Sequence, residues 1–121
     1  MSKVLIIDDD PNNIFALKAV LRSRSVEALS AGSVHAGLSL LKKEKDIRLI
    51  LLDMMMPETD GYEMIHLIRL SDELKDIPVI AVTAQAMKGD REKCLEAGAN
   101  DYVSKPIDVD RLFGLLHDYI K

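Results

Sequence analysis

Aromatic residues, cysteine and excess positive charge are all scarce in this 121-residue sequence. It has no Trp, two Phe and three Tyr among 48 % hydrophobic residues, so we expect an aliphatic core in a globular chain. The single cysteine, Cys94, cannot form an internal disulfide. A net charge of -4 argues against a nucleic-acid-binding surface, because phosphate backbones are bound by clustered Lys and Arg.

Long hydrophobic runs are also missing. No segment approaches the roughly 18 to 20 apolar residues that a membrane span needs, and the chain before Val4 is too short for a signal peptide. We therefore expect a cytoplasmic protein without a membrane partner. A length of 121 residues is typical of one compact domain, so residues 1–121 are expected to form a single domain.

Short runs rich in Val, Ile and Leu alternate with segments of helical period. Such runs are typical of parallel strands that are covered on both faces. The expected strands are residues 4–7, 27–31, 49–52, 79–82 and 102–104. Between them apolar residues recur at helical spacing, as at Ile14, Leu17 and Leu21. The alternation predicts an α/β fold, an open five-stranded parallel sheet with helices on both faces.

Reactive polar side chains stand directly after four of these runs. They are Asp8, Asp9 and Asp10 after 4–7, Asp53 after 49–52, Thr83 after 79–82, and Lys105 after 102–104. In an open parallel sheet the site lies at the carboxyl ends of the strands, where the strand order switches direction. These side chains are therefore expected to meet at one edge of the sheet.

Carboxylates that crowd into one pocket repel each other unless a cation neutralises them. Oxygen ligands without a nearby pair of His or Cys favour Mg²⁺ over Zn²⁺. The Asp53 carboxylate can then be a nucleophile toward a phosphoryl donor, while Lys105 and the Thr83 hydroxyl bind the phosphoryl oxygens. The pattern predicts Mg²⁺-assisted phosphoryl transfer by positioning and electrostatics.

Several other conspicuous residues have simpler interpretations. Asp10 is as readily a helix N-cap as a ligand, so it is left out of the predicted site. The methionines at 54–56 are expected to contribute packing and backbone groups instead of soft-metal ligands. His35, His66 and His117 stand on separate predicted helices without metal-ligand spacing, and we expect them at the surface.

In this order the motifs resemble a receiver domain of two-component signalling, similar to the chemotaxis response regulator and to receivers of hybrid histidine kinases. The matching segments are Asp8-Asp9, Asp53-Met54-Met55-Met56-Pro57 with Asp60-Gly61, Thr83-Ala84, and Lys105-Pro106. The resemblance covers essentially the whole chain. It implies a flavodoxin-like sheet with strand order 2-1-3-4-5.

The resemblance also implies roles for individual residues. Asp53 would be the phosphorylated residue. Asp9 and Asp53 would bind Mg²⁺ directly, Asp8 would bind it through water, and Met55 would lend its backbone carbonyl. The Lys105-Pro106 bond would be cis, which would aim the ammonium into the acidic pocket.

Thr83 and Tyr102 match the positions of a conformational switch in that family. After phosphorylation Thr83 would move toward the phosphate, and Tyr102 would turn from an exposed to a buried position in the space behind it. The segment 87–97 has the weakest apolar stripe and contains Gly89, so we expect it to move most readily. The surface formed by this helix, the strand with Tyr102 and the last helix would then change.

As a phosphorelay switch, the domain would take its phosphoryl group from a histidine kinase or a histidine phosphotransfer protein. It would signal to a downstream effector domain or protein, and it could form a weak homodimer. It would not be a free-standing enzyme, although it could be the receiver part of a hybrid kinase, which residues 84–91 and 94–102 resemble most.

Two other classes of protein share part of this pattern. Asp8-Asp9-Asp10 contains the Asp-x-Asp of haloacid-dehalogenase-like aspartyl-phosphate hydrolases, but that pattern expects Thr or Val where Asn12 stands. A flavodoxin-like electron carrier would have the same strand order, but its phosphate loop would be rich in Ser, Thr and Gly instead of acidic. The identity of the phosphorylated aspartate and the colour of the purified protein separate these classes from a receiver.

Overall fold

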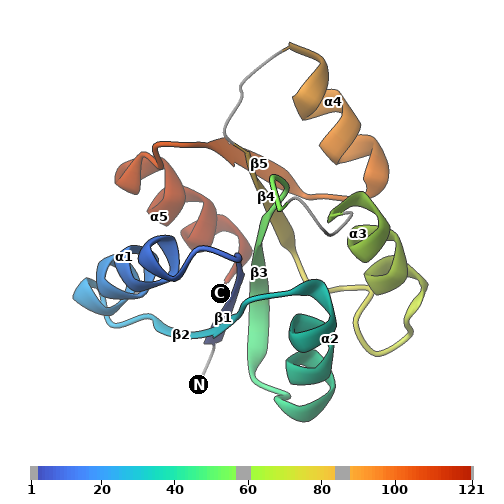
Figure 1. Cartoon of the computed structure of the whole chain (residues 1–121), viewed down its shortest axis with the longest axis horizontal. Coiled ribbons are helices and arrows are strands. Elements are labelled where there is room, and N and C mark those ends of the chain that lie inside the picture. The colour runs from blue at the N-terminus through green and yellow to red at the C-terminus, as the bar shows by residue number, and fades with distance from the viewer. Residues whose placement is uncertain (1–2, 57–60, 84–87, 121) are drawn as a thin grey trace.

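The computed structural model describes residues 3–56, 61–83 and 88–120. Within these ranges five strands alternate with five helices (Figure 1). The strands are β1 (Lys3–Ile7), β2 (Glu27–Ala31), β3 (Ile47–Asp53), β4 (Val79–Thr83) and β5 (Asp101–Ser104). The helices are α1 (Pro11–Ser23), α2 (Val34–Lys43), α3 (Gly61–Leu70), α4 (Lys88–Ala97) and α5 (Val109–Tyr119). Pro57, Asp60, Ala84 and Met87, which belong to motifs or segments named above, lie outside the described residues.

The five strands form one parallel sheet in the order β2-β1-β3-β4-β5, which confirms the predicted fold class. From β1 the chain passes to β2 on one side of it and then to β3 on the other side. The strand order therefore switches direction between β1 and β3. The register pairs Ile7 with Leu52 across these strands, so the next residues, Asp8 and Asp53, leave the sheet side by side.

Two apolar layers cover the sheet, one on each face. Helices α2, α3 and α4 pack on the face of Leu5 and Ile7, and α1 and α5 pack on the face of Val4 and Ile6 (Figure 1). All of β4 is buried, as is all of β3 except Arg48. Because both faces are covered, the strands are firm supports for the residues at their carboxyl ends.

Polar residues fix where the helices begin. The Asp10 side chain accepts a hydrogen bond from the backbone N–H of Asn12 at 2.9 Å, and Pro11 occupies the first turn of α1. Asp10 is therefore the N-cap, in agreement with its exclusion from the predicted site. Ser33 caps α2 in the same way, by accepting from Ala36 N–H at 3.1 Å. No helix in the described ranges has the length and apolar character to cross a membrane.

Helix α4 makes the poorest use of apolar packing. Of its residues 91–97, only Cys94 is buried, with 1 % of its surface exposed. This agrees with the weak apolar stripe that was predicted for the segment 87–97. The helix ends at Ala97 and is followed by Gly98, which has a φ of 116°, a value that residues other than glycine rarely adopt.

The guanidinium of Arg69, in the last turn of α3, ties three segments together. It donates hydrogen bonds to the carbonyls of Lys75, Ile77 and Gly98 and to the Asn100 side chain, over distances of 2.7 to 3.0 Å. The Asn100 side chain in turn accepts from the backbone N–H of Val79, the first residue of β4. Burial lowers the pKa of Arg69, an effect that the nearby Asp76 opposes. The Arg69 guanidinium thus links the segments that precede β4 and β5, at the edge of the sheet opposite the acidic residues.

Candidate functional site

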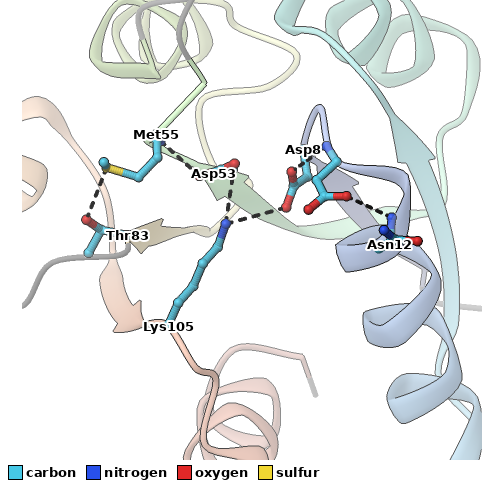
Figure 2. A network of polar contacts seen from close by, with 7 residues as sticks. Asp8, Asn12, Asp53, Met55, Thr83 and Lys105 are labelled. Atoms are coloured by element: carbon cyan, nitrogen blue, oxygen red, sulfur yellow. Dashed lines mark hydrogen bonds and ion pairs between the residues drawn. The ribbon is translucent and has the colours of Figure 1, made fainter.

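The structure brings the predicted site residues together at the carboxyl edge of the sheet (Figure 2). Asp8 and Asp9 follow β1, Asp53 ends β3, Thr83 ends β4, and Lys105 follows β5. The register pairs Asp53 with Val82, and Thr83 with Ser104. The topology alone therefore places these side chains next to each other, as the sequence predicted.

Three carboxylates form the acidic part of the site. Oxygens of Asp8, Asp9 and Asp53 all lie within 4.8 Å of one another. Asp8 and Asp53 are only 2 % and 4 % exposed, whereas Asp9 is open to solvent. Burial raises the pKa of Asp8, and the neighbouring Asp53 raises it further, while the Asp10 N–H and the Lys105 ammonium oppose the shift. Packing these acids together therefore costs free energy while they are ionised.

One cation faces this cluster. The Lys105 Nζ lies 3.6 Å from Asp53 Oδ2 and 3.8 Å from Asp8 Oδ2 (Figure 2). Its backbone N–H donates to the Thr83 carbonyl at 2.8 Å, which fixes the start of the side chain beside β4. The Lys105-Pro106 bond is cis, as the resemblance implied. A single ammonium does not neutralise three carboxylates, so the site keeps a net negative charge.

The donor set suits a hard divalent cation. It consists of carboxylate oxygens, with no His or Cys in the group. Two of its carboxylates are buried and one faces solvent, so a bound cation would keep coordination positions for water or for a phosphate oxygen. These are the properties by which Mg²⁺ is selected over Zn²⁺.

Backbone N–H groups fix the two buried carboxylates. Asp8 Oδ1 accepts from the Asp10 N–H, and Asp53 Oδ1 accepts from the Met55 N–H, each at 2.9 Å. The second oxygen of each carboxylate faces Lys105. The Asp53 carboxylate is therefore held in one orientation, by the Met55 N–H on one oxygen and by the Lys105 ammonium facing the other.

The predicted switch residues lie on the neighbouring strands. Thr83 is 4 % exposed, and its Oγ1 lies 3.8 Å from the Met55 Sδ (Figure 2). Tyr102 on β5 is half-buried, between the exposed and buried positions that the resemblance implied. The guanidinium carbons of Arg91 and Arg111 lie 6.0 and 5.9 Å from the centre of its ring. The aromatic ring therefore joins α4 to α5.

A groove beside the site was not predicted from the sequence. Its volume is about 260 Å³, and it runs between α1 and the segment that joins β5 to α5. Its lining is mostly apolar, and Asp8 and Lys105 stand at one end. Phe15 of the same helix α1 is 77 % exposed. Phe15 is not part of the groove's lining, but its exposure could be read from the sequence, because it lies off the apolar stripe of Ile14, Leu17 and Leu21.

Of the residues left out of the predicted site, the histidines lie at the surface and the methionines differ in exposure. His35, His66 and His117 are exposed on α2, α3 and α5, as expected. Met56 is 5 % exposed and packs in the core, in agreement with the packing role predicted for the methionine run, whereas Met55 is 48 % exposed. The prediction for the methionines at 54–56 did not include an exposed Met55 side chain.

Comparisons with known proteins agree in fold and in family. A family model of the response regulator receiver domain matches residues 4–117. The polar-differentiation response regulator DivK of Brucella anthropi is 35 % identical over 117 residues, which are 97 % of this chain and 94 % of DivK. The signal transduction histidine-protein kinase BarA of Escherichia coli is 39 % identical over 116 residues, which are 96 % of this chain and 12 % of the kinase. The chemotaxis protein CheY4 of Vibrio cholerae has the same fold, with a TM-score of 0.90, 22 % identity and coverage of 99 % of both chains.

The raised pKa of Asp8 generates a prediction about stability. Between the usual carboxyl pKa of 3.8 and the raised value, the folded protein binds more protons than the unfolded chain, so its stability falls as the pH rises. In metal-free buffer at pH 7, Asp8→Asn should therefore raise the free energy of unfolding, by about 1.4 kcal/mol for each unit by which the pKa is raised. The gain should vanish near pH 3. Urea unfolding at several pH values measures both the gain in stability at pH 7 and its loss near pH 3.

Asp10→Asn is the matched control, because Asn also caps a helix well and Asp10 stands outside the acidic group. It should leave the stability nearly unchanged across the same pH range. Adding Mg²⁺ should stabilise the wild type more than Asp8→Asn. If Asp8→Asn lowers the stability at pH 7 without metal, the ion pair with Lys105 outweighs the cost of burial and this account of the site is wrong.

Proposed function

Because the chain belongs to the response regulator receiver family of two-component signalling, we propose that it accepts a phosphoryl group on Asp53 with the assistance of Mg²⁺. The observation that carries the proposal is the position of Asp53, a buried carboxylate with Lys105 Nζ at 3.6 Å and two further carboxylates beside it. Asp53 ends the strand that lies between β1 and β4. A phosphoryl group on it is therefore within reach of residues on both sides.

In the proposed transfer an Asp53 carboxylate oxygen attacks the phosphorus of the donor, and the bond from phosphorus to the donor's leaving atom breaks. The Lys105 ammonium then moves from the carboxylates to a phosphoryl oxygen, and the Thr83 hydroxyl binds another. Mg²⁺, held by Asp9 and Asp53 directly, by Asp8 through water and by the Met55 carbonyl, would neutralise charge on the phosphoryl oxygens. The Met55 N–H keeps Asp53 oriented during the attack.

We expect phosphorylation at Asp53 alone when the protein is incubated with Mg²⁺ and acetyl phosphate. Asp53→Asn should remove the modification and keep the fold, because the amide fits the same space. Mass spectrometry of the intact protein and of its peptides measures this, and EDTA should suppress it. Asp10→Asn, which changes a carboxylate outside the acidic group, should be labelled like the wild type. Labelling at Asp8 with turnover of many phosphomonoesters would favour the hydrolase reading instead.

The proposed signal starts at Thr83. A phosphoryl group adds about -1.5 to -2 charge and strong acceptor oxygens, which favour the conformation in which Thr83 turns toward Asp53. Tyr102, half-buried and next to Thr83's strand, would then turn fully inward. Its ring stands between Arg91 of α4 and Arg111 of α5, so its turn changes contacts of both helices. A downstream effector, or a second copy of the domain, would read this altered surface.

Amide hydrogen exchange with and without beryllofluoride tests this coupling. On activation, the exchange rates of the amides between residue 88 and Tyr102 should change. This range contains α4, which has few buried side chains and should therefore shift most easily. Thr83→Ala should bind the mimic at Asp53 and lose most of that change, since the hydroxyl transmits it. The helix α2, which packs on the same face of the sheet but over β2 and β1, away from α4, is the internal reference. An unchanged pattern, or an equal change in Thr83→Ala, would refute the coupling.

We propose that the phosphoryl donor, a histidine kinase or a histidine phosphotransfer protein, docks over the groove between α1 and the β5–α5 segment. The groove is apolar and leads to Lys105 and Asp8, so a donor histidine lying over it is directed at the acidic edge. Phe15, largely exposed on the same helix, supplies the kind of aromatic anchor that dominates protein interfaces.

Phe15→Ala should slow transfer from a protein phosphodonor by about tenfold, the effect of losing one aromatic anchor. Transfer from acetyl phosphate, which needs no docking surface, should be unchanged. Leu70→Ala removes another exposed side chain, 68 % exposed at the end of α3, and should affect neither reaction. Radiolabel transfer from the phosphorylated donor measures the rates. Equal slowing with both donors would mean that Phe15 acts on the site itself, not on docking.

A further inference from the structure

The methionines that follow β3 differ sharply in exposure. Met56 is 5 % exposed and Met64 on α3 is fully buried. Met54 is half-buried, and its sulfur packs so closely on Gly61 that a Cβ added there would lie 2.7 Å from it. Met55 is 48 % exposed. Among the methionines in the described residues, Met55 is therefore the most exposed.

The Met55 side chain also lies over a residue that the proposed transfer requires. Its Sδ is 3.8 Å from the Thr83 Oγ1, and its backbone N–H donates to Asp53 at 2.9 Å (Figure 2). A thioether sulfur is a weak hydrogen-bond acceptor. The Met55 thioether therefore does little to hold the Thr83 hydroxyl when that hydroxyl turns to a phosphoryl oxygen.

We propose, on the basis of the proposed function, that Met55 is an oxidation site whose sulfoxide holds the Thr83 hydroxyl and so weakens the response to phosphorylation. The oxidant is a hydroperoxide such as hydrogen peroxide. A lone pair of the Met55 sulfur attacks one peroxide oxygen, the O–O bond breaks, and an S–O bond forms. The sulfur loses two electrons, and the other oxygen leaves as water after taking up a proton. A methionine sulfoxide reductase with a thiol as reductant reverses the step.

The sulfoxide changes the competition for the Thr83 hydroxyl. Its oxygen is a strong acceptor that projects from a sulfur 3.8 Å from the Thr83 Oγ1. When the S–O bond points obliquely toward the hydroxyl, the two oxygens come within the range of about 2.5 to 3.0 Å for O–H···O bonds. Thr83 must then break a good hydrogen bond before it can bind a phosphoryl oxygen. Because the backbone of Met55 is tied to Asp53, the sulfoxide stays beside the site.

Peptide mapping after treatment with dilute hydrogen peroxide tests the site without reference to phosphorylation. Met55 should gain oxygen faster than Met54, Met56 and Met64, in the order of their exposure. Oxidation of Met55 at the same rate as Met56 or Met64, while the protein remains folded by circular dichroism, would overturn the proposal.

The functional test compares the affinity for beryllofluoride with Mg²⁺ before and after oxidation, by isothermal titration calorimetry. The wild type should bind about fivefold more weakly after oxidation, the effect of about 1 kcal/mol. Met55→Leu and Thr83→Ala are each compared with their own untreated samples, and treatment should leave both affinities unchanged. Thr83→Ser keeps the hydroxyl and should keep the peroxide effect. Treatment with a methionine sulfoxide reductase should restore the wild type.

The outcomes separate this inference from the proposed function. An untreated protein that fails to bind beryllofluoride or to be phosphorylated at Asp53 would overturn both. An untreated protein that binds normally, with no loss after Met55 is oxidised, would overturn the inference alone. An equal loss in Thr83→Ala would show that the sulfoxide acts by bulk and not through the hydroxyl, which also overturns it.

Discussion

Two buried carboxylates, Asp8 and Asp53, share one ammonium, Lys105, and the rest of the site depends on that arrangement. Burying two carboxylates close together is unfavourable. They stay there because each stands at the end of a strand that is packed on both faces. The free energy for holding them together comes from the aliphatic core, not from the site. Because this edge of the sheet carries more negative than positive charge, it favours the binding of a further cation. It also favours the binding of a group with which the Lys105 ammonium can form a new ion pair.

The fold could be predicted from the sequence because strand burial appears directly as apolar runs. Residues 79–82 were expected as a strand, and β4 differs by one residue. The third strand was expected at 49–52 but is Ile47–Asp53, because exposed Arg48 interrupts the run that Ile47 begins. The weakly apolar fifth strand also gained one residue, Asp101. Each of these strands includes a polar residue at or near its end, which an apolar run does not reveal.

The composition of the site could also be predicted, since topology alone delivers residues after strands to one edge. What could not be predicted depends on packing between segments far apart in the chain. The sequence of α3 does not indicate that Arg69 bridges two loops, because its acceptors are backbone carbonyls at Lys75, Ile77 and Gly98. Nor do three consecutive methionines reveal that Met55 alone turns outward over Thr83. Such contacts leave no periodic signal.

The bonds of Arg69 also decide what kind of movement is open to α4. Two of its donors hold the Gly98 carbonyl, just beyond the end of the helix, and a third holds Asn100 at the start of β5. The helix begins at Lys88, ten residues from Gly98, or about 15 Å along its axis. Because Arg69 fixes the Gly98 end, a movement of α4 at the carboxyl edge of the sheet would be a rotation about Gly98. A small displacement at the edge becomes a change of angle, and the positions farthest from Arg69 travel the most.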